Sequence, residues 1–258
     1  MKQFLSTSML ILISTSTVAE TPTWFEIELY LYKQKNETKE AWPDPQPKAY
    51  NSEYFTLIHG DNVKKNNQYQ WVARKEKTYF LKNSAPFLLT KDHLKLKRKV
   101  AYLNHHIDNE PVMHVAWKQG IVSKQNSIPF RIIQGRNFGE IFRPNGFEIS
   151  DTNKVEEELN QPKTIKNVYE IDGEITIYLD HYLFIIADIT LRKEGAKTVR
   201  KYDTLSSLLP QGGSSTYNFL EQIPMKQNRR VRSGEIHYFD HPYLGMIIQI
   251  RRLKEQPS

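Results

Sequence analysis

The residues best suited to chemistry lie close together near the C-terminus. Glu235, His237, Asp240 and His241 place two carboxylates and two imidazoles within seven residues. Zinc accepts both kinds of ligand, so a metal-dependent hydrolase is one hypothesis for this segment. The spacing is unfavourable, because Glu235 and His237 would share one face of a strand while Asp240 and His241 would lie in the following turn. We therefore predict a structural turn here, in which Asp240 caps the backbone and Gly245 supplies the geometry that starts the last strand.

Other routes to catalysis have little support in the sequence. The chain has no cysteine, no Gly-x-Ser-x-Gly elbow, and no Ser-x-x-Lys with the partner motifs of penicillin-binding proteins. The glycine pair Gly212-Gly213 lacks the lysine and the preceding strand that a phosphate-binding loop requires. We therefore expect a protein without enzymatic activity, metal or cofactor.

Charge is distributed unevenly along the chain, whose formal net charge is +7. The segment 61–101 has eleven basic and three acidic residues, whereas 139–188 has eleven acidic and four basic residues. The basic segment is a candidate surface for an anionic ligand, and the acidic segment is a candidate docking surface for a protein. Four cations of this segment are expected on the exposed side of a helix, and we predict them as binding residues: Lys95, Lys97, Arg98 and Lys99. The alternative is that these four form an ordinary solvated helix face.

The first nineteen residues have the layout of a cleavable export signal. Lys2 provides the positive start, the stretch 4–13 is apolar, and Thr17-Val18-Ala19 supplies small residues before a cleavage point at Glu20. The apolar stretch is shorter than the roughly 20 residues that span a bilayer. We therefore expect residues 20–258 to form the mature protein outside the cytoplasm, without a transmembrane anchor and without nucleic acid as a partner.

Hydrophobic patterns predict the elements that carry these residues. Alternation from Phe25 to Leu31 predicts a half-buried strand, and alternation over 175–179 and 183–191 predicts a β-hairpin. A second hairpin is expected to turn through 240–245. The four-three-four spacing of apolar residues predicts one helix from Thr90 to His106, with a buried stripe of Leu96, Val100, Leu103 and Ile107.

Two further strands and two loops complete the predicted fold. The strands 112–117 and 128–133 are expected to flank a loop around Gly120, and the segments 61–70 and 137–161 are expected to be long polar loops. The fold class that follows is α+β, an antiparallel sheet built from hairpins with one long helix and long polar loops.

The segment 229–245 also carries a family resemblance. It contains, in order, three arginines, Ser-Gly-Glu, His-Tyr, Asp-His-Pro and Leu-Gly, and a final apolar strand follows. This order resembles the closing hairpin of the CsiV family of periplasmic peptidoglycan-binding proteins. The segments 24–29, 114–119 and 172–183 resemble, in the same order, other strands of that family. The resemblance spans the mature chain.

The resemblance implies a non-enzymatic periplasmic protein that binds peptidoglycan. It also implies support of wall synthesis by a bifunctional, class A penicillin-binding protein with its outer-membrane lipoprotein activator as a further partner. A basic surface suits the carboxylates of stem peptides, and Trp42 or Trp71 could stack on sugars, whereas Trp117 is expected in the core. If the closing hairpin is more than structural, its recognition residues would be Arg232, Glu235, His237, Asp240 and His241. A protein-only adaptor of wall synthases, docking through the acidic segment, remains the alternative.

Overall fold

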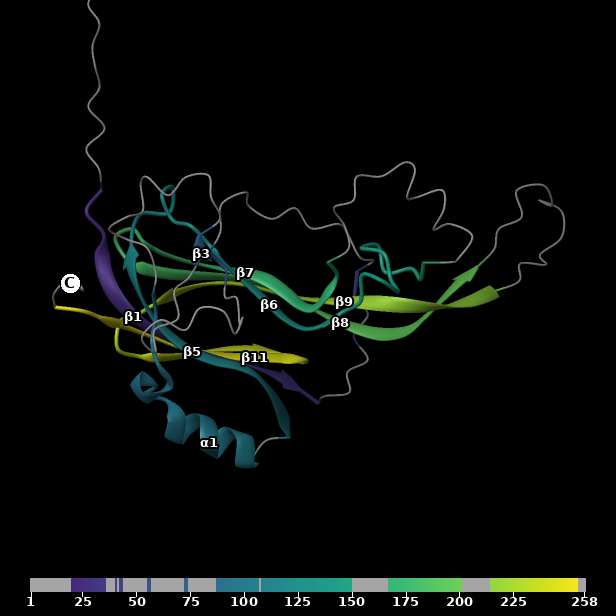
Figure 1. Cartoon of the computed structure of the whole chain (residues 1–258), viewed down its shortest axis with the longest axis horizontal. Helices are drawn as coiled ribbons and strands as arrows, with labels where there is room; N and C mark the ends of the chain where they lie inside the picture. The colour runs from purple at the N-terminus through teal and green to yellow at the C-terminus, as the bar shows by residue number, and fades with distance from the viewer. Residues whose placement is uncertain are drawn as a thin grey trace, which may run out of the picture.

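The described part of the chain is a sandwich of two β-sheets with one α-helix on its outside (Figure 1). In the computed structural model of the protein, the described residues are 20–35, 40, 42–43, 55–56, 72–73, 87–106, 108–149, 167–200 and 214–254. The predicted signal, Trp71, the polar loop 61–70 and residues 150–161 of the predicted loop 137–161 lie outside them. Within the described residues, no helix combines the length and apolar character that a membrane crossing needs.

Two sheets of different composition form the layers. The first sheet is antiparallel, in the order β10-β11-β1-β5-β4, with strands Ile236–His241, Leu244–Arg252, Thr23–Gln34, Asn109–Ile121 and Phe87–Leu88. The second has the order β3-β2-β6-β7-β8-β9, with strands Val72–Ala73, Phe55–Thr56, Phe130–Asn137, Tyr169–Leu179, Leu183–Arg200 and Ser214–Val231. Only β2 and β6 pair in parallel among these described strands. The two-sheet arrangement agrees with the expected α+β class, although strands predominate.

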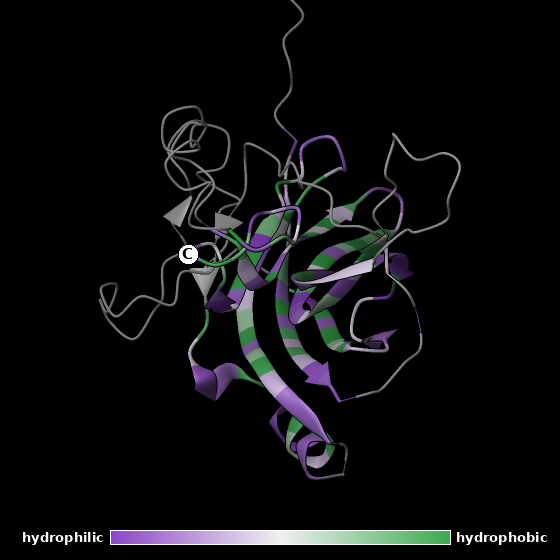
Figure 2. Cartoon of the chain, turned by 90° about the vertical axis from the view of Figure 1, so that its right-hand side faces the viewer, coloured by the Kyte–Doolittle hydropathy of each residue, from purple (hydrophilic) through white to green (hydrophobic). Residues whose placement is uncertain are grey.

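The main core lies between the two sheets. Where the long strands of the two sheets face each other, every second residue points inward, which produces the alternating bands of hydropathy in Figure 2. Ile27 and Ile248 of the first sheet and Ile185 of the second are fully buried in this core. Trp117 is also fully buried and packs edge-on against Phe130, as expected of a core residue. Burial of these side chains removes apolar surface from water and holds the sheets together.

Two predicted strand units are confirmed. The hairpin of β7 and β8 has Leu179 opposite Leu183, so its register matches the alternation in the sequence. Strand β1 also forms as predicted, but it is buried on both faces. Its odd-numbered residues enter the core, while Tyr30 and Tyr32 pack beneath the helix. The expectation of a half-buried strand was wrong because the helix covers the second face.

The predicted long helix is two shorter elements. A 3-10 turn spans Lys91–His93, and helix α1 spans Lys97–His106. The chain cannot continue as one helix because the backbone N–H groups of Lys95 and Leu96 donate to a carboxylate of β1. The predicted apolar stripe is confirmed at Leu96, Val100 and Leu103, which pack on Tyr30, Tyr32 and Ile247. Ile107 lies outside the described residues.

The connections near Gly120 and in the closing hairpin differ from the prediction. Gly120 lies inside β5, and the chain then passes through 122–129 to β6, which belongs to the other sheet. In the closing hairpin, the turn is only Pro242-Tyr243, because Asp240 and His241 already pair with Gly245 and Leu244.

Candidate functional site

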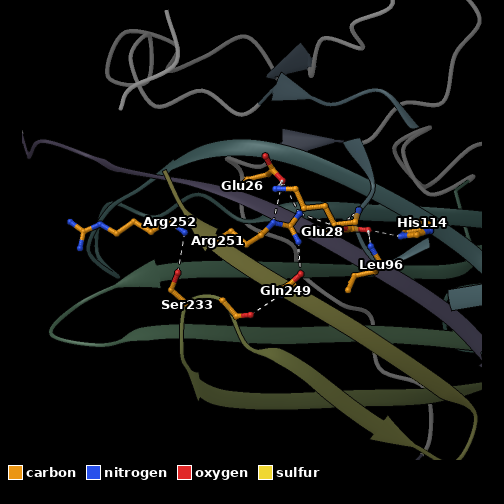
Figure 3. A network of polar contacts seen from close by, with 10 residues as sticks. Glu26, Glu28, Leu96, His114, Ser233, Gln249, Arg251 and Arg252 are labelled. Carbon is orange, nitrogen blue, oxygen red and sulfur yellow. Dashed lines mark hydrogen bonds and ion pairs between the residues drawn. The ribbon is translucent and has the colours of Figure 1, made fainter. Parts of the chain in front are cut away.

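The outer face of the first sheet carries a buried polar network centred on Glu28 (Figure 3). This carboxylate accepts the backbone N–H groups of Lys95 at 2.9 Å and Leu96 at 2.8 Å. Arg251 of β11 donates to it at 3.0 Å, and Nε2 of His114 lies 3.0 Å away. Glu28 is fully buried, so these four partners replace the water that its charge would otherwise bind.

A second carboxylate extends the network toward the surface. Glu26 accepts hydrogen bonds from Arg251 at 2.8 Å and 3.2 Å, and Nζ of Lys95 lies 3.1 Å from it. Arg251 also contacts Gln249, which donates to the backbone oxygen of Gly234 at 2.7 Å. One arginine on the last strand therefore joins two carboxylates of the first strand and the turn before β10.

The network controls the ionisation of both carboxylates. Burial by itself raises the pKa of Glu28, but hydrogen bonds from His114, Leu96, Lys95 and Arg251 outweigh burial and hold this pKa below its ordinary value. Burial likewise raises the pKa of Glu26, and the contacts with Arg251 and Lys95 reverse that effect, so that its pKa is also lowered. Both groups are held in their charged forms.

The cations predicted as a binding surface divide into two kinds. Lys97, Arg98 and Lys99 are exposed at the start of α1 and make no ion pair within the described residues. Lys95 instead precedes the helix and pairs with Glu26. Three adjacent cations at the start of α1 are therefore exposed, whereas Lys95 contributes an ion pair to the network around Glu28.

Tyr102 is a residue of this surface that the sequence analysis missed. It is 64% exposed and follows Arg98 by four positions on α1, so the two side chains share one helix face. Tyr102 lies outside the predicted apolar stripe of the helix, and this position in the sequence indicates that its ring is exposed. The exposed face of α1, defined as Lys97, Arg98, Lys99 and Tyr102, thus offers cations beside an aromatic ring.

The residues predicted in the closing hairpin separate into two groups. Arg232 and Glu235 form an exposed ion pair at 3.7 Å in the turn before β10. Nε2 of His237 lies 3.2 Å from the backbone nitrogen and 3.1 Å from the backbone oxygen of Arg232. The side chain of His237 therefore braces this turn.

Asp240 and His241 lie at the other end of β10. Asp240 accepts hydrogen bonds from Tyr238 Oη at 2.9 Å and from Gln34 Nε2 at 3.1 Å, so both donors are side chains and not the backbone N–H groups of the cap that we predicted. Nδ1 of His241 accepts the backbone N–H of Tyr243 at 3.2 Å, and its ring lies 5.1 Å from that of Trp42. Burial lowers the pKa of His241. The four residues of the metal hypothesis thus do not converge on one point.

Gly245 has a different role from the one predicted. Its φ angle is not positive, so no special backbone geometry requires a glycine. A Cβ atom built at Gly245 would instead lie 2.1 Å from Cζ of Tyr32, because the tyrosine ring crosses directly over this position. Tyr32 in turn donates to the hydroxyl of Tyr238 at 3.1 Å. The glycine makes room for a buried aromatic ring.

Several carboxylates of the acidic segment are occupied by internal partners. Lys33 contacts Glu170 at 2.7 Å, and Arg131 binds both oxygens of Asp172 at 2.9 Å and 2.8 Å. Asp172 is buried. The acidic residues between 150 and 166 lie outside the described residues, so the docking surface predicted for this segment stays a prediction.

Comparison with known proteins identifies the family. No curated protein matches the chain, and no solved structure matches it. The sequence model of one family, described as "Peptidoglycan-binding protein, CsiV", matches residues 4–253, which is nearly the whole chain. The match includes β1 and β11, whose side chains build the network around Glu28. The chain therefore belongs to the CsiV family of peptidoglycan-binding proteins.

Proposed function

We propose that this protein is a non-enzymatic periplasmic accessory protein that binds peptidoglycan through the exposed face of α1. The observation that carries the proposal is the family match over residues 4–253. The predicted export signal agrees with a periplasmic location, because peptidoglycan lies outside the cytoplasm.

The chemistry of the helix face supports this choice of surface. Stem peptides of peptidoglycan bear carboxylates, which Lys97, Arg98 and Lys99 can attract and bind by charge-assisted hydrogen bonds. Tyr102 adds an exposed ring on which the apolar face of a sugar can pack. Glu28 and Arg251 fix the start of the helix on the sheet, so the cations are presented on a rigid base.

The wider role that we propose is support of wall synthesis by a class A penicillin-binding protein, together with its outer-membrane lipoprotein activator. The protein would hold the synthase near its polymeric product. Cross-linking in intact cells tests this part, because the captured partners should be a synthase or its activator.

A protein-only adaptor is the second candidate function. It is favoured by Val199 and Tyr217, which are 36% and 43% exposed on the part of β8 and β9 that extends beyond β7 (Figure 1). Exposed apolar side chains on a projecting ribbon suit a protein partner. Co-sedimentation with purified sacculi separates the candidates: the wall-binding protein pellets with sacculi, whereas the adaptor stays in the supernatant yet captures synthases in cells.

A further inference from the structure

A second group of aromatic and cationic side chains lies on the outer face of the second sheet. Leu183 and Ile177 point into the core, so Phe184 and Tyr178 point outward on the same strands. Their rings stack with centroids 5.0 Å apart and planes 9° apart. Tyr178 is buried and Phe184 is half-buried, so this stack forms the packed base of the sheet end where β7 turns into β8.

Two cations lie over aromatic rings at this end of the sheet. The guanidinium of Arg230 lies 4.6 Å above the ring of Tyr182, and Nζ of Lys124 lies 5.7 Å from the ring centroid of Tyr178. Arg230 is exposed, and Tyr182 is 49% exposed. Neither cation forms an ion pair within the part of the chain that the structure describes. Cation–π contacts thus orient both charges without neutralising them.

The arrangement has the parts of a site for a sugar that carries a carboxylate. A guanidinium is planar and keeps its N–H groups in its own plane, where they can bind a carboxylate by two parallel hydrogen bonds. The exposed part of Tyr182 offers an apolar surface to a pyranose ring. Lys124 supplies a second positive charge beside the same stack.

We infer that the exposed side chains of Tyr182, Arg230 and Lys124, which lie beside the packed rings of Tyr178 and Phe184, form a second peptidoglycan site. It takes a glycan unit with its stem peptide: the sugar packs on Tyr182 and a peptide carboxylate binds Arg230. The inference rests on the proposed function, because both need the wall as ligand.

The second site lies on the opposite side of the sandwich from α1. Helix α1 covers the outer face of the first sheet, whereas the side chains of Arg230 and Phe184 lie on the outer face of the second sheet. One molecule could therefore hold two wall segments at once. Two weak sites that engage the same polymer give tighter overall binding than either alone.

Three soluble probes test the inference by isothermal titration calorimetry on the mature protein. They are a disaccharide-tetrapeptide, chitotetraose as the sugar without a carboxylate, and the free stem tetrapeptide as the carboxylate without the sugar. The test variants are Tyr182→Ala and Arg230→Gln, with Arg230→Lys as the conservative change. The controls are Tyr217→Ala and Arg252→Gln, which remove an exposed ring and an exposed charge elsewhere. Thermal unfolding is measured to check that every variant is folded.

We expect the disaccharide-tetrapeptide to bind more tightly than either fragment. Arg230→Gln should weaken it about tenfold or more, since a hydrogen bond to a charged group contributes roughly 1.5–3 kcal/mol. Tyr182→Ala should also weaken it, Arg230→Lys should recover part of the loss, and both controls should bind like wild type. Equal affinity of wild type, Tyr182→Ala and Arg230→Gln would overturn the inference, as would chitotetraose binding that depends on neither residue.

Sacculus pelleting, run in parallel, separates this inference from the proposed function. Wild type that pellets with sacculi, while Arg230→Gln and Tyr182→Ala bind the disaccharide-tetrapeptide normally, contradicts the second site alone. Wild type that binds neither sacculi nor the disaccharide-tetrapeptide contradicts both.

Discussion

The backbone N–H of Leu96 donates a 2.8 Å hydrogen bond to Glu28, so a buried carboxylate of β1 determines where helix α1 can begin. The same carboxylate is joined to the last strand through Arg251 at 3.0 Å. The first strand, the last strand and the helix thus meet at one side chain (Figure 3). The position of the proposed wall-binding face therefore depends on a residue that is itself inaccessible to the wall.

Glu28→Gln should destabilise the protein strongly. The change keeps the size of the side chain but removes the charge, leaving Arg251 without one of its two carboxylates. Breaking a buried ion pair typically costs about 3–5 kcal/mol of unfolding free energy. Chemical denaturation measures the loss, and Glu140→Gln, an exposed carboxylate, serves as the control with an expected change below about 0.5 kcal/mol. A Glu28→Gln protein as stable as the control would contradict the role assigned to this network.

The same network predicts how stability depends on pH. The folded-state pKa values of Glu26 and Glu28 are lowered relative to the ordinary value of 4.5. Groups with lowered pKa values stabilise the fold above their unfolded pKa and lose that contribution as the pH falls through the folded pKa. Melting temperature should therefore decline as the pH is lowered below 4.5, more steeply for wild type than for Glu28→Gln. Parallel curves would show that Glu28 does not contribute to the decline.

Gly245→Ala should be more harmful than an ordinary glycine substitution. The added methyl group would overlap the ring of Tyr32, which is almost fully buried and cannot move aside without cost. We expect a loss of about 3 kcal/mol, the upper end for overpacking. Gly234→Ala is the matched control: its φ is +88° but no atom lies within 4 Å, so only backbone strain of about 1–2 kcal/mol should appear. Equal losses in the two variants would refute the steric role of Gly245.

The sequence predicted the elements whose hydrophobic period was regular. The alternation in β1, β7 and β8 gave the strands and the hairpin register, and the stripe through Leu96 and Val100 gave the buried side of α1. These patterns are local, because each records which side chains of one element face away from water. The position of Trp117 in the core followed from the same reasoning.

Features that depend on contacts between distant residues could not be predicted. The helix starts at Lys97 because Glu28, sixty-eight residues before Leu96, takes two backbone N–H groups that a longer helix would use. Gly245 is required by Tyr32 on a neighbouring strand, and nothing in the local sequence shows that ring. In the proposed second site, Tyr182 and Arg230 come together only when β8 and β9 pair. Their positions in the sequence therefore do not indicate that they form a group.

Asp240→Ala should lower stability modestly and leave wall binding intact. The substitution removes the acceptor of hydrogen bonds from Tyr238 and Gln34 on an exposed part of the hairpin. We expect a loss of about 1 kcal/mol, measured by thermal unfolding, with unchanged pelleting well below the melting temperature. His241→Ala should behave in the same way. A variant that keeps its melting temperature but no longer binds wall or partner would make this hairpin a recognition site.

Replacing Lys97, Arg98 and Lys99 together with glutamine should weaken sacculus binding and flatten its dependence on salt. The three side chains are exposed and without ion-pair partners in the described residues, so unfolding free energy should change by less than about 0.5 kcal/mol. Lys95→Gln is the comparison, because it disrupts the contact with Glu26 and should affect stability more than binding. Unchanged binding of the triple variant would move the wall site away from α1.

The most direct test of wall recognition compares native sacculi with sacculi whose carboxylates have been converted to neutral amides. Mature wild-type protein, residues 20–258, is pelleted with each across a range of salt concentrations. We expect strong sedimentation with native sacculi at low salt, progressive loss as salt screens the charges, and weak sedimentation with amidated sacculi at every salt concentration. Absence of sedimentation with native sacculi at low salt, or equal sedimentation with both preparations, would contradict the claim that cations of this protein bind the carboxylates of the wall.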